Sequence, residues 1–311
     1  MKSRPSKDQI YRRNINALST RFQDGLDLPR VISIETQVRC NAKCSFCPYP
    51  TSPRKGEEME SDLFYKIIDD LAELPPEHVF HFTLARINEP LLDERLQDFS
   101  DYVAKHLPGA RQSFWSNGTM LNPGGFEWME TYEGSSLNIS LNSVNEADHL
   151  ALMGFGLTKV LRNLDYLHGL KEAGDLEAEV TLHAPFQSQE KSREIQTFCA
   201  KRFPLFKLGI RPFFVWEGDE KTGAREREQT GVVDGQGFDV TALACGQWFD
   251  LHILANGFAT KCCIDQTGFS TDKYDARQHH ALDIYRQSQS LRRSLPGRGS
   301  VSGCESCAHL G

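Results

Sequence analysis

The chain has 311 residues, of which 39% are hydrophobic and 25% are charged. This composition excludes an intrinsically disordered chain and leaves enough apolar residues for one large domain and a small one. The net charge of −7 argues against a nucleic-acid-binding surface, because such surfaces need clustered lysine and arginine. No stretch reaches the ~20 continuous apolar residues of a membrane span, and the polar, charged start has no export signal. We therefore expect a cytoplasmic protein without membrane contact.

From residue 31 to residue 215, β-branched-rich apolar runs alternate with helical patterns. The expected strands are Val31–Thr36, His78–Leu84, Ala110–Trp115, Leu137–Leu141, Glu177–His183 and Lys207–Val215. The expected helices are Ser61–Leu74, Asp93–His106, Gly124–Tyr132, Val160–Glu172 and Glu190–Phe203. Strands joined by helical crossovers predict an α/β fold with a parallel sheet, either open or closed into a partial barrel. In such folds ligands bind at the C-terminal ends of the strands.

After residue 215 the composition changes to a segment rich in charge and glycine, which predicts a linker. A hairpin is expected beyond it, with Phe249–Leu254 and Phe258–Cys262 on either side of an Asn-Gly turn, followed by a helix at Ala281–Ser294. The predicted plan is an arm at 1–30, a barrel at 31–215, a linker at 216–239 and a small domain at 240–311.

Nine cysteines are the most informative feature of the composition. Their number is odd and cytosolic thiols stay reduced, so metal or redox chemistry is favoured over a disulfide framework. Cys199 stands alone in a helical pattern, which is typical of a small core residue. The other eight fall into an N-terminal and a C-terminal group, and this distribution predicts two metal sites.

The N-terminal group is Cys40, Cys44 and Cys47, in the spacing C-x3-C-x2-C. It directly follows the first expected strand, so it lies in the loop at the C-terminal end of that strand. A closed structural zinc site needs four ligands, and no nearby cysteine or histidine supplies the fourth. Three thiolates suit a [4Fe–4S] cluster whose remaining iron is open to a substrate or cofactor.

This motif, with Phe46 before its last cysteine, resembles the signature of the radical S-adenosylmethionine enzymes, and the resemblance implies that Phe46 is one of the cofactor contacts. The resemblance implies a partial (β/α)6 TIM-like barrel whose open iron binds S-adenosyl-L-methionine. It also implies that one electron, from a donor such as flavodoxin or ferredoxin, splits this cofactor into methionine and a hydrogen-abstracting 5′-deoxyadenosyl radical. The alternative is a zinc or redox loop that shares the spacing.

The resemblance extends to the ends of three later strands. Glu89 would contact the methionine amino group, next to Asn88, which stands where glycine is usual in the family. The ribose would be contacted by Ser116, Asn117, Ser140 and Asn142, the last standing where aspartate is common. Hydroxyl and amide groups suit a ribose, although serine and asparagine are also ordinary turn residues.

The C-terminal group resembles the Twitch or SPASM extension, a hairpin and helix that carry auxiliary clusters in one radical S-adenosylmethionine subfamily. The resemblance implies one auxiliary [4Fe–4S] cluster on Cys245, Cys262, Cys304 and Cys307. Cys262 and its neighbour Cys263 point to opposite faces of a strand, so only one of them is expected to ligate. Cys262 is favoured, and Cys263 is the alternative ligand, a core thiol or a hydrogen-atom donor. A zinc-stabilised module is the alternative for the entire extension.

These features together predict a radical oxidoreductase with two [4Fe–4S] clusters. Only about 30 residues precede the first expected strand, which is too few for the peptide-recognition domain of many peptide-modifying relatives. We therefore expect a small polar metabolite of a biosynthetic pathway, such as an amino sugar, aminocyclitol or nucleoside, undergoing dehydrogenation, epimerisation or sulfur insertion. The alternatives are modification of a peptide or protein side chain and, more remotely, a non-catalytic zinc or iron–sulfur protein.

Overall fold

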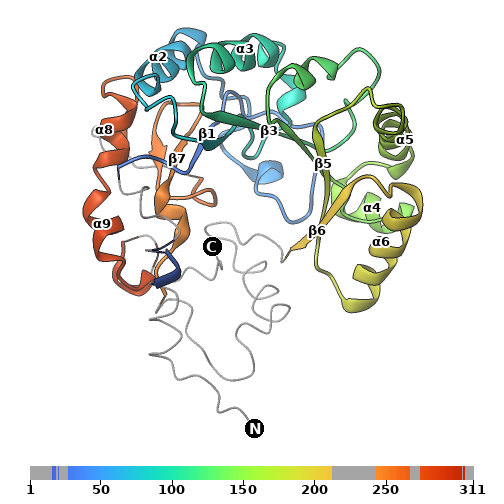
Figure 1. Cartoon of the computed structure of the whole chain (residues 1–311). Coiled ribbons are helices and arrows are strands. Elements are labelled where there is room, and N and C mark those ends of the chain that lie inside the picture. Colours follow the sequence, from blue (N-terminus) through green and yellow to red (C-terminus); the bar gives the residue numbers. More distant parts are fainter. Residues whose placement is uncertain are drawn as a thin grey trace.

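A single curved sheet forms the centre of the protein. The structure, a computed structural model, describes residues 16–18, 20, 27–211, 243–266, 274–302 and 304. The strands are β1 (Val31–Ile34), β2 (Phe80–Thr83), β3 (Ala110–Ser116), β4 (Ser136–Ser140), β5 (Glu179–Pro185), β6 (Lys207–Arg211), β7 (Asp250–Ile253) and β8 (Ala259–Thr260). They are ordered β6-β5-β4-β3-β2-β1-β7-β8, with every pair parallel except β7 and β8. The predicted α/β partial barrel is confirmed, and the sheet is not closed (Figure 1).

Helices cover the convex side of this sheet. They are α2 (Ser61–Leu71), α3 (Leu96–His106), α4 (Glu146–Met153), α5 (Leu157–Ala173), α6 (Gln189–Arg202), α8 (Ala281–Arg286) and α9 (Gln289–Ser294). Figure 1 shows α2, α3, α5, α6, α8 and α9 on the outer side of the strands. The last expected helix is interrupted between α8 and α9, and the expected helix at 124–132 is only a 3-10 helix, Glu127–Thr131. A glycine with φ of 80° at position 124 explains the late start of the latter, because that backbone conformation is not helical.

Alternation along the strands separates an apolar face from a polar one. Ile32, Phe82 and Ile139 are buried in a core with helix residues such as Phe64 and Leu164. Their neighbours along each strand point to the concave face. By register these include Ser33, Thr83, Trp115, Asn138, His183 and His252. The concave face is therefore lined by polar and aromatic groups.

The predicted C-terminal hairpin is present as β7 and β8, and it continues the main sheet. β7 pairs in parallel with β1, from Val31 opposite Asp250 to Ile34 opposite Ile253. The predicted linker at 216–239, most of the N-terminal arm, the end of the sixth expected strand and Cys307 lie outside the described residues. The predicted domain boundaries stay predictions.

The unpredicted helix α4 supports the loop that follows β1. The backbone N–H groups of Lys43 and Ser45 donate to the carbonyls of Met153 and Leu152, each over 2.9 Å. These carbonyls lie in the last turn of α4, where helix carbonyls lack intrahelical partners. Gly154 ends the helix with φ of 77°, and a Cβ placed on it would lie 2.8 Å from the Cβ of Lys43.

We predict that Gly154→Ala lowers the free energy of unfolding by about 1–3 kcal/mol more than Gly174→Ala does. Gly174 ends α5 with φ of 82°, so both substitutions incur the same kind of backbone strain. Only the first adds a clash, because a Cβ on Gly174 has nothing within 4 Å. Urea denaturation measures both losses. Equal losses would show that close packing of the loop on α4 contributes nothing.

His252 is buried on β7 without a hydrogen-bond partner. It is 3% exposed, and neither ring nitrogen finds a partner among the described residues. Burial, and then the positive charges of Arg86 and Arg30, hold the pKa of His252 well below 6.5. The folded protein therefore keeps this imidazole neutral, although Asp250 lies 3.9 Å from its Nε2 atom.

We expect His252 to make the fold sensitive to acid. The unfolded chain protonates this histidine below a pH of about 6.5 and the folded chain does not, so stability falls as the pH drops. One such histidine accounts for up to about 1.4 kcal/mol between pH 7.5 and pH 5.5. His252→Asn should reduce the acid-induced loss seen in urea denaturation by about that amount. His279→Asn, a control at an exposed histidine, should leave the loss as in the wild type; a similar reduction in both variants would contradict the assignment.

Candidate active site

The loop after β1 brings together the three cysteines of the N-terminal group. Burial raises the pKa of the Cys40 thiol to about 11 and that of the Cys47 thiol to about 12. The pKa of Cys44 is raised as well, by burial and then by the charges of Cys47 and Cys40. The N–H of Ala42 donates to the sulfur of Cys40 over 3.4 Å. Sulfur atoms that affect one another in this way lie close together, and a nearby metal charge would keep them ionised.

The donor set fits an iron–sulfur cluster. Three cysteines lie on one loop, and in a [4Fe–4S] cluster each thiolate binds a different iron, so three sulfurs suffice. A closed structural zinc site would need a fourth ligand.

Glu89 is a buried carboxylate beside this loop. It is 1% exposed and accepts backbone N–H groups from Asn117 at 2.6 Å and Leu91 at 3.4 Å. Burial raises the pKa of Glu89 to about 7 in spite of these hydrogen bonds. No lysine or arginine in the described segments forms an ion pair with it. A buried carboxylate without a cation suits a ligand ammonium group, as in the methionine part of S-adenosylmethionine.

Asn117 links the end of β3 to the cysteine loop. Its Nδ2 donates to Oδ1 of Asn41 over 2.6 Å, and its Oδ1 accepts the hydroxyl of Thr119 over 2.6 Å. Asn41 closes the network by donating to the Thr119 hydroxyl over 2.8 Å. The side chain of Asn117 also acts to lower the pKa of the Cys40 thiol, which burial raises. This predicted cofactor residue therefore fixes the loop that carries Cys40.

The other predicted cofactor residues lie around the same strand ends. Ser116 accepts the N–H of Gly118 over 3.0 Å. The amide of Asn142 contacts Sδ of Met153, and that sulfur lies 3.5 Å from Sγ of Cys44. Ser140 and Phe46 are half-buried. Contact of Phe46, Ser116, Asn117, Ser140 and Asn142 with the cofactor stays a prediction.

Asn88 uses its side-chain amide within its own loop. Its Oδ1 accepts the N–H of Arg86 over 2.8 Å, and its Nδ2 donates to the carbonyl of Leu84 over 3.1 Å. The residue that replaces the usual glycine of the family therefore shapes the loop after β2. A direct cofactor contact from Asn88 would have to compete with these two bonds.

Segments that carry the C-terminal cysteines are held side by side. Lys261, before Cys262, donates to the carbonyl of Ser302, two residues before Cys304. The N–H of Arg298 donates to the carbonyl of Leu243 over 3.0 Å, close to Cys245 in the chain. Cys307 lies outside the described residues, so the predicted ligand set stays a prediction.

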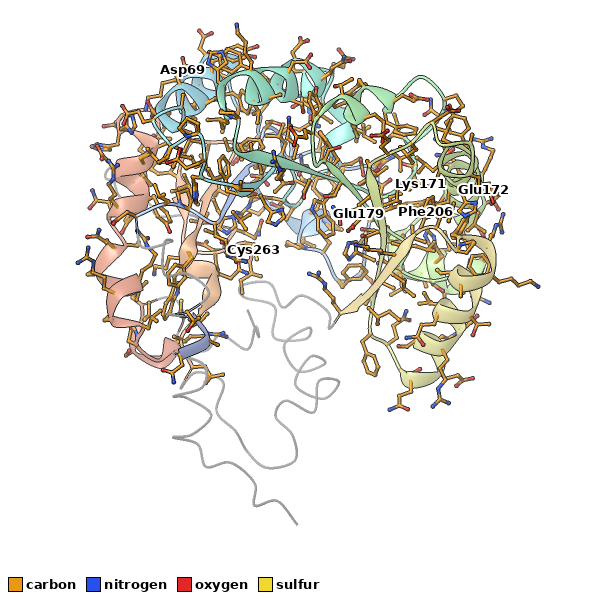
Figure 2. The ribbon with its side chains drawn as sticks, in the orientation of Figure 1. Asp69, Lys171, Glu172, Glu179, Phe206 and Cys263 are labelled. Carbon is orange, nitrogen blue, oxygen red and sulfur yellow. The ribbon has the colours of Figure 1, made fainter. Side chains whose placement is uncertain are left out.

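Cys262 and Cys263 have different surroundings. Burial raises the pKa of the Cys262 thiol, while the backbone N–H groups of Ile264 and Asp265 act to lower it. Cys263 lies on the concave side of the sheet (Figure 2). Burial raises the pKa of its thiol to about 12, while Arg86 acts to lower it. Cys245 is close enough to Cys263 to affect its pKa, so both adjacent cysteines remain compatible with ligation.

An aromatic and polar wall lies on the opposite part of the concave face. The rings of Trp115 and His183 lie 4.6 Å apart, and Nε2 of His183 bonds to Oδ1 of Asn138 over 2.9 Å. His183 is the register neighbour of Ser140. Burial, and then Arg211, lower the pKa of His183 to about 4, so its ring is neutral at physiological pH. The wall therefore offers a flat ring and a neutral hydrogen-bonding group next to the predicted ribose site.

Several residues at the site have no sequence signal. Met153 contacts Cys44 from helix α4, which the apolar periodicity did not predict. Arg54 forms an ion pair with Glu35, which is fully buried and directly follows β1. A charged residue on each of two distant segments does not indicate a pair before the fold is known.

None of the helices in the described part of the chain is long and apolar enough to cross a membrane.

Comparison with known proteins agrees with the geometry. Residues 34–175 match the Radical SAM superfamily. The chain is 23% identical over 318 residues to the mycofactocin maturase MftC of Mycolicibacterium smegmatis, covering 94% of this chain and 79% of the maturase. It is 32% identical over 94 residues to the S-adenosyl-L-methionine-dependent 2-deoxy-scyllo-inosamine dehydrogenase of Niallia circulans, covering 29% of this chain and 36% of the dehydrogenase.

A solved structure shares the fold. Streptococcus suis SuiB bound to its precursor peptide SuiA superposes with a TM-score of 0.63 at 13% identity, covering 88% of this chain and 69% of SuiB. The cysteine loop, the partial barrel and the sequence match are mutually consistent. The chain therefore carries a domain of the Radical SAM superfamily over residues 34–175.

Proposed function

We propose that the protein is a radical S-adenosylmethionine enzyme that removes a hydrogen atom from a small polar metabolite. The observation that carries the proposal is the meeting of three half-buried cysteines with the carboxylate of Glu89, which has no cationic partner among the described residues. Cys40, Cys44 and Cys47 would hold a [4Fe–4S] cluster, and Glu89 would bind the cofactor's amino group. When bound, cluster and cofactor supply a 5′-deoxyadenosyl radical for hydrogen abstraction.

The chain's own residues would orient the cofactor and exclude water. The network of Asn117, Asn41 and Thr119 fixes the cysteine loop against the end of β3. Ser116 and Ser140 would offer hydroxyl groups to the ribose from neighbouring strand ends. Glu89 is shielded from solvent, which strengthens electrostatic binding of an ammonium group.

We also propose a second [4Fe–4S] cluster on Cys245, Cys262, Cys304 and Cys307. Two backbone N–H groups, of Ile264 and Asp265, act on the pKa of the Cys262 thiol, and this favours Cys262 over Cys263 because N–H groups near sulfur tune iron–sulfur clusters. The cluster would accept an electron from the substrate or bind it. Cys263 would remain on the concave side as the alternative ligand or a hydrogen-atom donor.

The concave wall supports a polar, ring-shaped substrate such as an amino sugar, aminocyclitol or nucleoside. The Trp115 ring suits the apolar face of such a molecule, and His183 and Asn138 suit its hydroxyl groups. The similarity to the inosamine dehydrogenase favours dehydrogenation over epimerisation or sulfur insertion. A cytoplasmic location and a flavodoxin or ferredoxin as electron donor complete the proposal.

The second candidate is modification of a peptide or protein side chain. The similarity to the mycofactocin maturase extends over 94% of this chain, and SuiB shares the fold with a precursor peptide bound. Labelled substrates separate the two candidates. Anaerobic, reduced protein would be given S-adenosylmethionine with deuterated 2-deoxy-scyllo-inosamine or with deuterated peptides, and 5′-deoxyadenosine would be analysed by mass spectrometry.

Deuterium from the inosamine supports the first candidate, and deuterium from a peptide supports the second. Absence of 5′-deoxyadenosine from protein loaded with iron would refute both and favour a non-catalytic metal protein.

Replacing Cys40, Cys44 and Cys47 together by alanine should remove about four of about eight irons and abolish 5′-deoxyadenosine formation. The remaining iron would belong to the C-terminal cysteines. Cys199→Ala is the control, since Cys199 lies in the core away from both groups. Iron analysis and chromatography of the reaction mixture check the result, and cofactor cleavage by the triple variant would contradict the assigned ligands.

Glu89→Gln should weaken S-adenosylmethionine binding about 10- to 100-fold, because it removes the charge that faces the ammonium group. Its similar size should leave the iron content unchanged. Glu133→Gln, at a carboxylate that is 91% exposed, is the control. Equilibrium dialysis with labelled cofactor measures both, and wild-type affinity in the Glu89 variant would remove this residue from the site.

A further inference from the structure

The loop after β2 faces two sites at once. Glu89, at its end, approaches the cysteine loop, and its N–H donates to the carbonyl of Arg39 over 2.8 Å. Three residues earlier, Arg86 reaches in another direction, towards the turn that carries Cys262 and Cys263. Asn88 lies between them and fixes the loop through its bonds to Arg86 and Leu84.

The Arg86 side chain binds backbone atoms of this turn. One guanidinium nitrogen donates to the carbonyls of Cys263 at 3.3 Å and Asp265 at 2.5 Å. The other lies 3.4 Å from the hydroxyl of Thr260, which itself donates to the carbonyl of Cys262 over 2.9 Å. Bonds from a charged donor to carbonyl groups are stronger than neutral ones. A single side chain therefore contacts the turn at three points.

A second arginine fastens the far end of the turn. Arg54, from the segment after the cysteine loop, donates to the carbonyl of Gln266 over 3.3 Å. The same guanidinium pairs with Glu35, and Glu35 also accepts the N–H of Ala255 over 3.3 Å. Arg86 and Arg54 both lie in the part of the chain that carries the proposed cofactor site, and both donate to backbone carbonyls of the turn.

We propose that Arg86 is a positioning residue that fixes the Cys262–Cys263 turn relative to the cofactor site. Through this contact the loop after β2 would set the place of the second metal site with respect to Glu89 and the first cysteine loop. The inference about the metal rests on the proposed function, whereas the hold of Arg86 on the turn does not.

The first test uses the metal-free, full-length protein and measures alkylation of Cys262 and Cys263 by iodoacetamide, with peptide mass spectrometry as the readout. Arg86→Met keeps the length of the side chain and loses its donors, so the two thiols should react about tenfold faster. Arg86→Lys, which keeps the charge, should give an intermediate rate. Arg111→Met is the matched control, because Arg111 is another half-buried arginine, on β3, and its ion pair with the exposed Glu133 spans 3.8 Å.

The alkylation rate of Cys199, a core residue, shows in the same experiment whether the fold as a whole has loosened. A rise at Cys262 and Cys263 with no change at Cys199 supports the proposal. Rates within twofold of the wild type in Arg86→Met overturn it. Should Cys199 also become reactive in Arg86→Met, the lysine variant decides, because partial rescue at the turn alone requires a specific hold by residue 86 and equal change at all three cysteines refutes it.

The second test addresses the metal site, in a chain with Cys40, Cys44 and Cys47 replaced by alanine. After anaerobic reconstitution, Arg86→Met should shift the electron paramagnetic resonance spectrum or the midpoint potential of the remaining cluster, and Arg86→Lys should restore part of the shift. An unchanged spectrum and potential refute positioning of the cluster by Arg86. If this chain binds no iron, the second cluster of the proposed function fails, and the alkylation rates still decide whether Arg86 holds the turn.

Discussion

The cysteine loop has little regular structure of its own, so its shape depends on hydrogen bonds from other segments. Helix α4 accepts the N–H groups of Lys43 and Ser45, and Asn117 binds Asn41 from the end of β3. These bonds from other segments fix the backbone that carries the three sulfurs. The close approach of Gly154 to Lys43 shows how little space separates loop and helix.

The same principle applies across the concave face. Charged side chains that are buried or half-buried bind backbone groups of segments far away in the sequence, as Glu89 does with Asn117 and Arg86 with Cys263. Buried groups of this kind are costly unless they are paired, which makes each contact specific for one arrangement. The loop after β2 therefore contacts both the proposed cofactor site, through Glu89, and the turn that carries Cys262 and Cys263, through Arg86.

The sequence predicted the fold well where periodicity was strong. β3 and α2 begin at the expected residues, and the Asn-Gly turn correctly predicted the hairpin of β7 and β8. The pairing of β7 with β1 was not predicted, because local patterns carry no information about which strands become neighbours. The cysteine spacing predicted metal chemistry in the loop after β1, and the family resemblance predicted Glu89 as a cofactor residue; both stay predictions.

Contacts between side chains could not be predicted in the same way. Asn88 was expected at the cofactor, and the structure shows its amide bonded within its own loop. Met153 and Arg86 gave no signal, since a methionine on a short helix and an arginine in a loop are common. Their roles follow from tertiary packing that the sequence pattern does not encode.

The pairing of β1 with β7 also has a consequence for biosynthesis. β1 is an interior strand of the finished sheet, yet one of its two neighbours ends at Ile253, near the C-terminus. While the ribosome is still making the middle of the protein, this strand exposes a row of unpaired backbone groups to the cell. Such an edge is a template for association with other chains, so nascent or truncated forms that lack β7 are the ones most exposed to aggregation and most dependent on chaperones.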